Sequence, residues 1–233
     1  MEAKKLPGIV EIIKKSFVIY FGGKNFLYFL KIALLNLGIT LGLVVPIIAT
    51  SGFFSKEPIV QQVGPAVTVF IPTIVLILAM VIWGLLMQAT VVVAVSSVVS
   101  GKVLGIKKTI KVAWGKLGRF FVTNFLSGLI ILVGFIFLII PGLVFMVWYQ
   151  FSQYLVIVRD LRPIEAIKES KKLISGYFWP VVGRLLGITL FFIIFQVVLG
   201  FIRILGPLII TLMTPFYVLV PYLLFDSLRK VKE

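Results

Sequence analysis

The 233-residue sequence contains no cysteine and no histidine, and only eight of its residues are acidic. Without cysteine there are no disulfide bonds or thiol nucleophiles, and without histidine there is no Ser-His-Asp triad. Zinc and copper sites built from thiolate or imidazole ligands are excluded for the same reason. We therefore expect no metal site, no cofactor and no catalytic residues in this chain.

Hydrophobic residues instead make up 61% of the chain and charged residues only 13%. A soluble domain is about 45–50% apolar and about 25% charged. The composition therefore excludes a soluble globular or disordered protein and predicts an all-α integral membrane protein, with residues 1–233 as a single membrane domain.

The apolar stretches predict six transmembrane helices, because a bilayer core about 30 Å thick is crossed by about 20 helical residues. The six expected spans are Asn25–Thr50, Pro65–Val99, Arg119–Ile140, Leu143–Val158, Phe178–Leu205 and Pro207–Leu228. Only Ile140-Pro141-Gly142 separates the third span from the fourth, and we expect a tight turn there, since proline cannot continue a helix. The alternative is one long kinked helix.

The basic residues predict the orientation of these spans. All but two of the 23 lysines and arginines fall on one side, and the two exceptions are Lys56 and Arg203. Lysine and arginine are retained in short cytoplasmic loops. We therefore expect a multi-pass protein of the cell membrane with both termini in the cytoplasm.

Three cytoplasmic segments have helical periodicity, with apolar residues on one face and lysines on the other. They are Gly8–Phe21, Ile106–Leu117 and Pro163–Ile174. Aligning Ile13 with Ile110 and Ile167 superposes all three and brings the following spans into a similar position. We interpret them as three repeats of an amphipathic interfacial helix plus a transmembrane hairpin, over residues 8–99, 105–158 and 163–228. The alternative is chance amphipathicity in a basic membrane protein.

A family resemblance is carried by Ile140-Pro141-Gly142, by the helix start at Pro163–Ser170 and by Gly176–Trp179. With these motifs the chain resembles the membrane domain attached to some bacterial glycerophosphoryl diester phosphodiesterases, and related six-span bacterial membrane families of the YciC type. The resemblance implies a six-span membrane domain. It does not imply phosphodiesterase activity, which in those enzymes belongs to a soluble barrel domain.

Ionisable residues are nearly absent from the predicted spans, and no carboxylate lies near the middle of one. Asp226, at the inner end of the last span, is expected to pair with Arg229 or Lys230. Four amides remain as candidates for a polar cavity that could hold an uncharged ligand: Gln88, Gln150, Gln153 and Gln196. The alternative is interhelical hydrogen bonding, worth about 0.6 kcal/mol for each bond.

The lysines of the three amphipathic segments are candidate binding residues for anionic lipid headgroups on the cytoplasmic side. They are Lys14, Lys15, Lys107, Lys108, Lys111, Lys168 and Lys172. Nucleic acid is not expected as a partner, because the chain has neither a folded soluble module nor a long basic arm. The alternative is that these charges serve only as the positive-inside signal.

These observations favour a non-enzymatic membrane protein that binds or organises anionic lipid, or scaffolds a protein partner. A homo-oligomer is a further option. The alternative is a transporter or flippase for an amphiphilic or uncharged small molecule. An enzyme of lipid metabolism fits least, since such enzymes usually gather acidic residues around a metal or use histidine as a base.

The absence of native cysteine makes the predicted orientation directly testable. In sealed right-side-out membrane vesicles, we expect a Ser55→Cys variant to react with a membrane-impermeant maleimide. A Ser100→Cys variant is expected to react only after the vesicles are permeabilised. Labelling of Ser100→Cys in sealed vesicles would contradict cytoplasmic placement of the basic loops.

Overall fold

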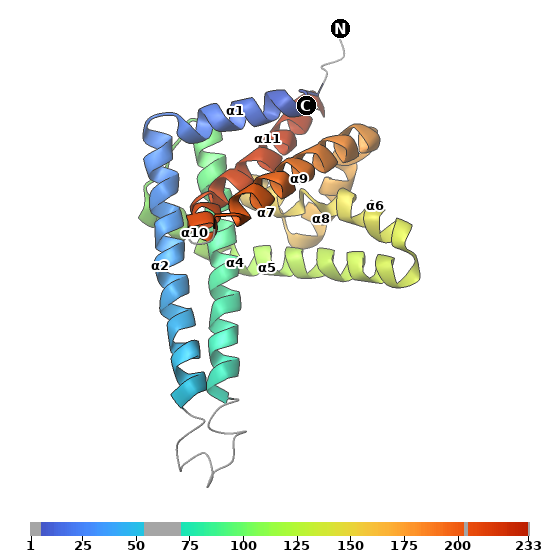
Figure 1. Cartoon of the computed structure of the whole chain (residues 1–233). Helices are drawn as coiled ribbons and strands as arrows, with labels where there is room; N and C mark the ends of the chain where they lie inside the picture. The colour runs from blue at the N-terminus through green and yellow to red at the C-terminus, as the bar shows by residue number, and fades with distance from the viewer. Residues whose placement is uncertain (1–5, 54–70, 203–204, 233) are drawn as a thin grey trace.

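A computed structural model describes residues 6–53, 71–202 and 205–232 of the chain. The secondary structure in these ranges is entirely helical (Figure 1). The helices are α1 (Ile9–Phe21), α2 (Lys24–Phe53), α4 (Ile71–Val99), α5 (Ile106–Phe137), α6 (Ile139–Tyr149), α7 (Ser152–Arg159), α8 (Pro163–Ile174), α9 (Phe178–Gly200), α10 (Leu205–Leu212) and α11 (Thr214–Lys232).

Five helical segments are long and apolar enough to cross a bilayer, and the bent pair of α10 and α11 makes a sixth if it counts as one span. The five are Lys24–Val45, Thr73–Val99, Ile106–Phe137, Ile139–Arg159 and Phe178–Gly200. Helices α10 and α11 meet at 43°. An all-helical, multi-pass membrane protein is thereby confirmed. Lys56 and Arg203 lie outside the described residues.

The turn between the third and fourth spans lies earlier than predicted. Leu138 is the extended residue that separates α5 from α6, with φ −161° and ψ 146°, and its N–H donates to the Gly134 carbonyl. Pro141 and Gly142 belong to the first turn of α6. The predicted turn at Ile140-Pro141-Gly142 is therefore wrong, because the first turn of a helix tolerates proline as readily as a loop does.

The predicted hairpin itself is confirmed, since α5 and α6 pack closely against each other. Two glycines allow this approach: a Cβ atom on Gly134 would lie 3.0 Å from the Cα of Gly142 and 2.7 Å from the ring of Phe145. A single kinked helix through this region is excluded. A short break at Gln150 and Phe151 then separates α6 from α7.

The three amphipathic segments differ in how they continue. Helices α1 and α8 end before glycines in the left-handed region, Gly23 at φ 44° and Gly176 at φ 86°, and a separate membrane helix follows each. The second segment has no such break. It continues as the first turns of α5, which runs for 32 residues to Phe137.

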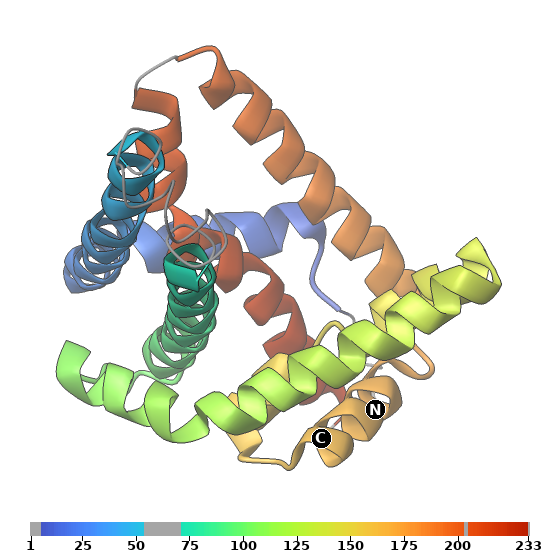
Figure 2. The same ribbon diagram turned by 90° about the horizontal axis from the view of Figure 1, so that it is seen from below.

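The hairpins diverge from a common packed region, here called the root, where parts of α4, α7 and α11 meet (Figures 1 and 2). Helices α2 and α4 run side by side down Figure 1, whereas α5 and α6 run across it. Figure 2 looks along α2 and α4, and here α5 and α9 lie across the view. The apolar faces of the spans are therefore left largely uncovered by other helices.

The buried core lies at this root rather than along the spans. It contains the carboxyl-terminal half of α4, most of α7 and most of α11. The ring of Tyr154 on α7 lies 5.5 Å from those of Tyr222 and Phe225 on α11, centroid to centroid. In contrast, α9 exposes Ile193 and Val197. This distribution is physically reasonable, since lipid tails solvate apolar side chains as well as another helix does.

Packing at the root follows a cyclic order. Helix α5 packs on α4, α8 packs on α7, and α1 packs on α11. Helices α5 and α8 thus each contact the helix that precedes them in the chain, and α1, the first helix, contacts α11, the last one. A contact between Gly187 of α9 and Ile9 of α1 reinforces the closure, because a Cβ on Gly187 would lie 2.5 Å from the Ile9 side chain.

The close approach at Gly134 predicts a position-specific effect of added volume. We expect Gly134→Ala to destabilise the hairpin of α5 and α6 by about 1–3 kcal/mol, as overpacking commonly does. Gly128→Ala, on the same helix with no atom within 4 Å of the added methyl, should leave the stability unchanged or higher. Thermal unfolding in detergent micelles measures the difference. Equal melting temperatures for the two variants would contradict the packing.

Candidate functional site

The candidate headgroup-binding lysines all lie on exposed faces. Lys14 and Lys15 are on α1, the lysines 107, 108 and 111 are on α5, and Lys168 and Lys172 are on α8. The opposite faces of the three helices are buried against the root. A helix held in this way presents its lysines to the surroundings while its buried face packs against other helices.

One lysine recurs at the same place in all three helices. Helices α1, α5 and α8 begin at Ile9, Ile106 and Pro163, and the sixth residue of each is a lysine: Lys14, Lys111 and Lys168. All three side chains are exposed. The periodicity of the sequence predicted this exposure, because these lysines lie opposite the apolar stripe.

The four glutamines do not gather in one place. The Gln88 side chain of α4 donates a hydrogen bond to that of Gln153 on α7, with 3.1 Å between Nε2 and Oε1. Gln150 points into a separate cleft. Gln196 is exposed on α9. The pair formed by Gln88 and Gln153 joins two helices at the root, which is the packing role that the sequence left open.

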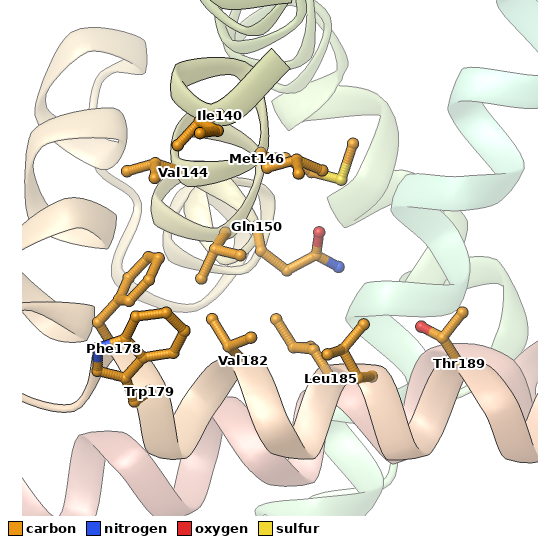
Figure 3. Close-up of a pocket in the computed structure, with 12 residues that line it drawn as sticks. Ile140, Val144, Met146, Gln150, Phe178, Trp179, Val182, Leu185 and Thr189 are labelled. Carbon is orange, nitrogen blue, oxygen red and sulfur yellow. The ribbon is translucent and has the colours of Figure 1, made fainter.

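A cleft of about 480 Å³ lies between α6 and α9 (Figure 3). Its walls are apolar, with Val144 and Met146 from α6 facing Val182 and Leu185 from α9. Phe178 and Trp179 lie together at one end, and Gln150 and Thr189 contribute the polar groups. The size and apolar lining suit a hydrocarbon chain better than a polar solute.

Asp160 forms an ion cluster with two basic residues of α5. Its carboxylate lies 2.9 Å from the Lys116 ammonium group and 3.2 Å from the Arg119 guanidinium group, both on α5. The hydrogen bond from Lys116 holds the pKa of Asp160 below its ordinary value. Asp160 has φ 56° and directly precedes the segment leading to α8, so this cluster fastens that segment to α5. Sequence analysis did not single it out, because the partners are far apart in the chain.

The predicted pairing of Asp226 is confirmed. This buried carboxylate lies 3.0 Å from the Arg229 guanidinium group and 2.6 Å from the Lys230 ammonium group, one turn further along α11. Its charge is thus compensated locally, which explains how it is accommodated at the root. Among the described residues, no three carboxylates lie close enough together to hold a metal ion.

No protein family, curated protein or solved structure matches this chain. The class that the fold defines is that of polytopic, all-helical membrane proteins. The resemblance to the phosphodiesterase-associated membrane domain rests on the short sequence motifs alone.

The Asp160 cluster predicts a pH-dependent contribution to stability. A carboxylate whose pKa is lowered by folding stabilises the protein above about pH 4 and loses this effect as the pH falls through the folded-state value. We expect Asp160→Asn to lower the free energy of unfolding at pH 7 by less than about 1 kcal/mol, because the pair is largely exposed, and to lower the melting temperature accordingly. Asparagine tolerates the left-handed backbone at this position, so the variant isolates the charge.

The same comparison at low pH is the control. Below the folded-state pKa both proteins carry a neutral side chain, and their melting temperatures should converge. A difference that persists unchanged after the pH has fallen through the folded-state pKa would show that the substitution acts through packing and not through charge.

Proposed function

We propose that the protein is a non-enzymatic component of the cell membrane, with both termini in the cytoplasm, that binds anionic lipid through the lysines of α1, α5 and α8. The observation that carries the proposal is the recurrence of an exposed lysine at the sixth position of each helix. This regularity exceeds what the positive-inside signal requires, since that signal needs only basic residues somewhere in each loop.

The proposal includes a threefold internal repeat. Supporting it, the fourth and eighth residues of the three helices are also buried in register. The fourth residues are Ile12, Thr109 and Ala166, and the eighth are Ser16, Ala113 and Ser170. The cyclic packing of α1, α5 and α8 on α11, α4 and α7 is a second, independent support. Three equivalent basic surfaces around one root would suit a layer of headgroups.

The diverging hairpins support an association with lipid for a different reason. They leave apolar side chains uncovered along most of their length, and the cleft between α6 and α9 offers an apolar slot of about 480 Å³. Its aromatic end, at Phe178 and Trp179, lies at the start of α9, the helix that follows α8 in the chain. Aromatic rings are favoured at the boundary between headgroups and acyl chains.

The transporter alternative receives less support. It requires a polar-lined path that includes at least two of the four intramembrane glutamines, whereas the cleft between α6 and α9 contains only Gln150. The amides of Gln88 and Gln153 bind each other. We therefore retain lipid binding as the proposed function.

Removing the lysines of one helix tests the proposal. The triple variant Lys107→Gln, Lys108→Gln, Lys111→Gln should retain fewer anionic lipids, because each lysine near a headgroup layer contributes about 1 kcal/mol, or about fivefold in affinity. Native mass spectrometry of protein in nanodiscs of mixed phosphatidylglycerol and phosphatidylcholine measures the enrichment of anionic lipid around the protein.

The corresponding triple substitution to arginine is the matched control, since it preserves the charge and should preserve the enrichment. Equal enrichment for the wild type and the glutamine variant would contradict the proposal.

A further inference from the structure

A groove of about 500 Å³ lies between the first turns of α2 and the segment that leads into α5. Lys24, Leu27, Tyr28 and Lys31 form its α2 wall, and Val103–Ile106 form the other. The four α2 residues follow the spacing of a single helix face, so both lysines border the same groove.

The inner side of this groove is held by hydrogen bonds. The hydroxyl groups of Tyr28 and Thr109 lie 2.7 Å apart in a buried contact between α2 and α5. The Thr109 hydroxyl also lies 3.1 Å from the Gly105 carbonyl oxygen, which it can use as an acceptor. The two walls are thereby fixed relative to each other, and the groove does not depend on the surface lysines for its shape.

At two comparable positions, the basic residues are bound by the protein itself. In each, a basic side chain of a long membrane helix binds the short segment that precedes an amphipathic helix, α8 in one case and α1 in the other. Lys116 and Arg119 of α5 bind Asp160, before α8. Arg184 of α9 donates to the carbonyl oxygens of Leu6 and Pro7, before α1, each at 2.8 Å.

The accepting residues in both cases occupy the same position relative to the helix that follows. Asp160 lies three residues before the start of α8, and Leu6 lies three residues before the start of α1. The residue three before the start of α5 is Val103, whose side chain lacks the carboxylate of Asp160 and whose carbonyl oxygen accepts no hydrogen bond from Lys24 or Lys31. Lys24 and Lys31 are both exposed, and within residues 6–53, 71–202 and 205–232 neither ammonium group has a hydrogen-bond or ion-pair partner.

An exposed apolar stripe continues from the two lysines along α2. Leu34, Leu41 and Val45 follow Lys31 at the spacing of the same helix face, and all three are exposed. A charged groove followed by an uncovered apolar stripe has the polarity of one phospholipid, headgroup first and acyl chain second. A free phosphate ion would use only the groove.

We propose that this groove binds the phosphate group of an anionic phospholipid, with Lys24 and Lys31 on the phosphate and an acyl chain along the stripe of α2. The lipid phosphate supplies the hydrogen-bond acceptors that the Asp160 carboxylate and the Leu6 and Pro7 carbonyl oxygens supply at the other two positions. This site rests on the proposed function, to which it adds one defined binding position on α2.

The first test removes the two charges. Native mass spectrometry follows the titration of detergent-purified protein with phosphatidylglycerol, and the affinity for the first bound lipid is measured. We expect Lys24→Gln, Lys31→Gln to weaken it by about tenfold or more. The matched control Lys24→Arg, Lys31→Arg keeps both charges at the groove and should change the affinity for the first lipid by less than about twofold.

The second test supplies an internal anion. Val103→Asp places a carboxylate at the position that Asp160 has before α8, and it should weaken the first lipid's binding by closing the groove from within. Val103→Asn has a similar shape without the charge and should bind lipid like the wild type. Because Val103 is exposed, both variants are expected to fold, which melting temperatures check.

The outcomes separate the two proposals. If the wild type does not prefer phosphatidylglycerol to phosphatidylcholine, the proposed function fails. The wild type can have this preference while the double variant Lys24→Gln, Lys31→Gln and the variant Val103→Asp both retain wild-type affinity for the first lipid. In that case only the proposed groove site is overturned. Competition by inorganic phosphate or glycerol 3-phosphate at comparable concentration would support a phosphate site and overturn the phospholipid as its source. No competition supports the lipid.

Discussion

The fold depends on one buried junction, where the ends of α4, α7 and α11 pack together. Tyr154 of α7 meets Tyr222 and Phe225 of α11 there at centroid distances of 5.5 Å, and the carboxyl-terminal half of α4 is almost fully buried beside them. Each diverging hairpin leads into one of these helices. The hairpins can therefore remain apart along their length, because their positions are determined at the root and lipid solvates the rest.

This arrangement has an electrostatic consequence. The root brings together most of the basic residues of a chain with 23 basic and eight acidic side chains, so internal pairing cannot neutralise them all. The available acids are used for specific fastenings: Asp160 holds the segment before α8, and Asp226 compensates the end of α11. The remaining lysines face outward, and this distribution of charge underlies our proposal of anionic headgroups as partners.

Local regularities in the sequence were sufficient for much of this description. Hydropathy located the long apolar helices, and helical periodicity identified the exposed faces of Lys14, Lys111 and Lys168, because both depend only on neighbouring residues. The pairing of Asp226 with Arg229 and Lys230 was also predictable, since it spans one helical turn. The turn near Pro141 was misplaced because proline fits a loop and a first helical turn equally well.

Contacts between distant segments were decided only by the tertiary structure. Gln88 meets Gln153 while Gln150 and Gln196 lie elsewhere, although all four looked equivalent in the sequence. The groove at Lys24 and Lys31 exists because Val103–Ile106 comes to lie beside α2, and Asp160 acquires its partners because α5 passes next to it. The sequence determined which faces are apolar or charged, through local periodicity. Which faces meet was decided by the packing at the root, where contacts join residues far apart in the chain.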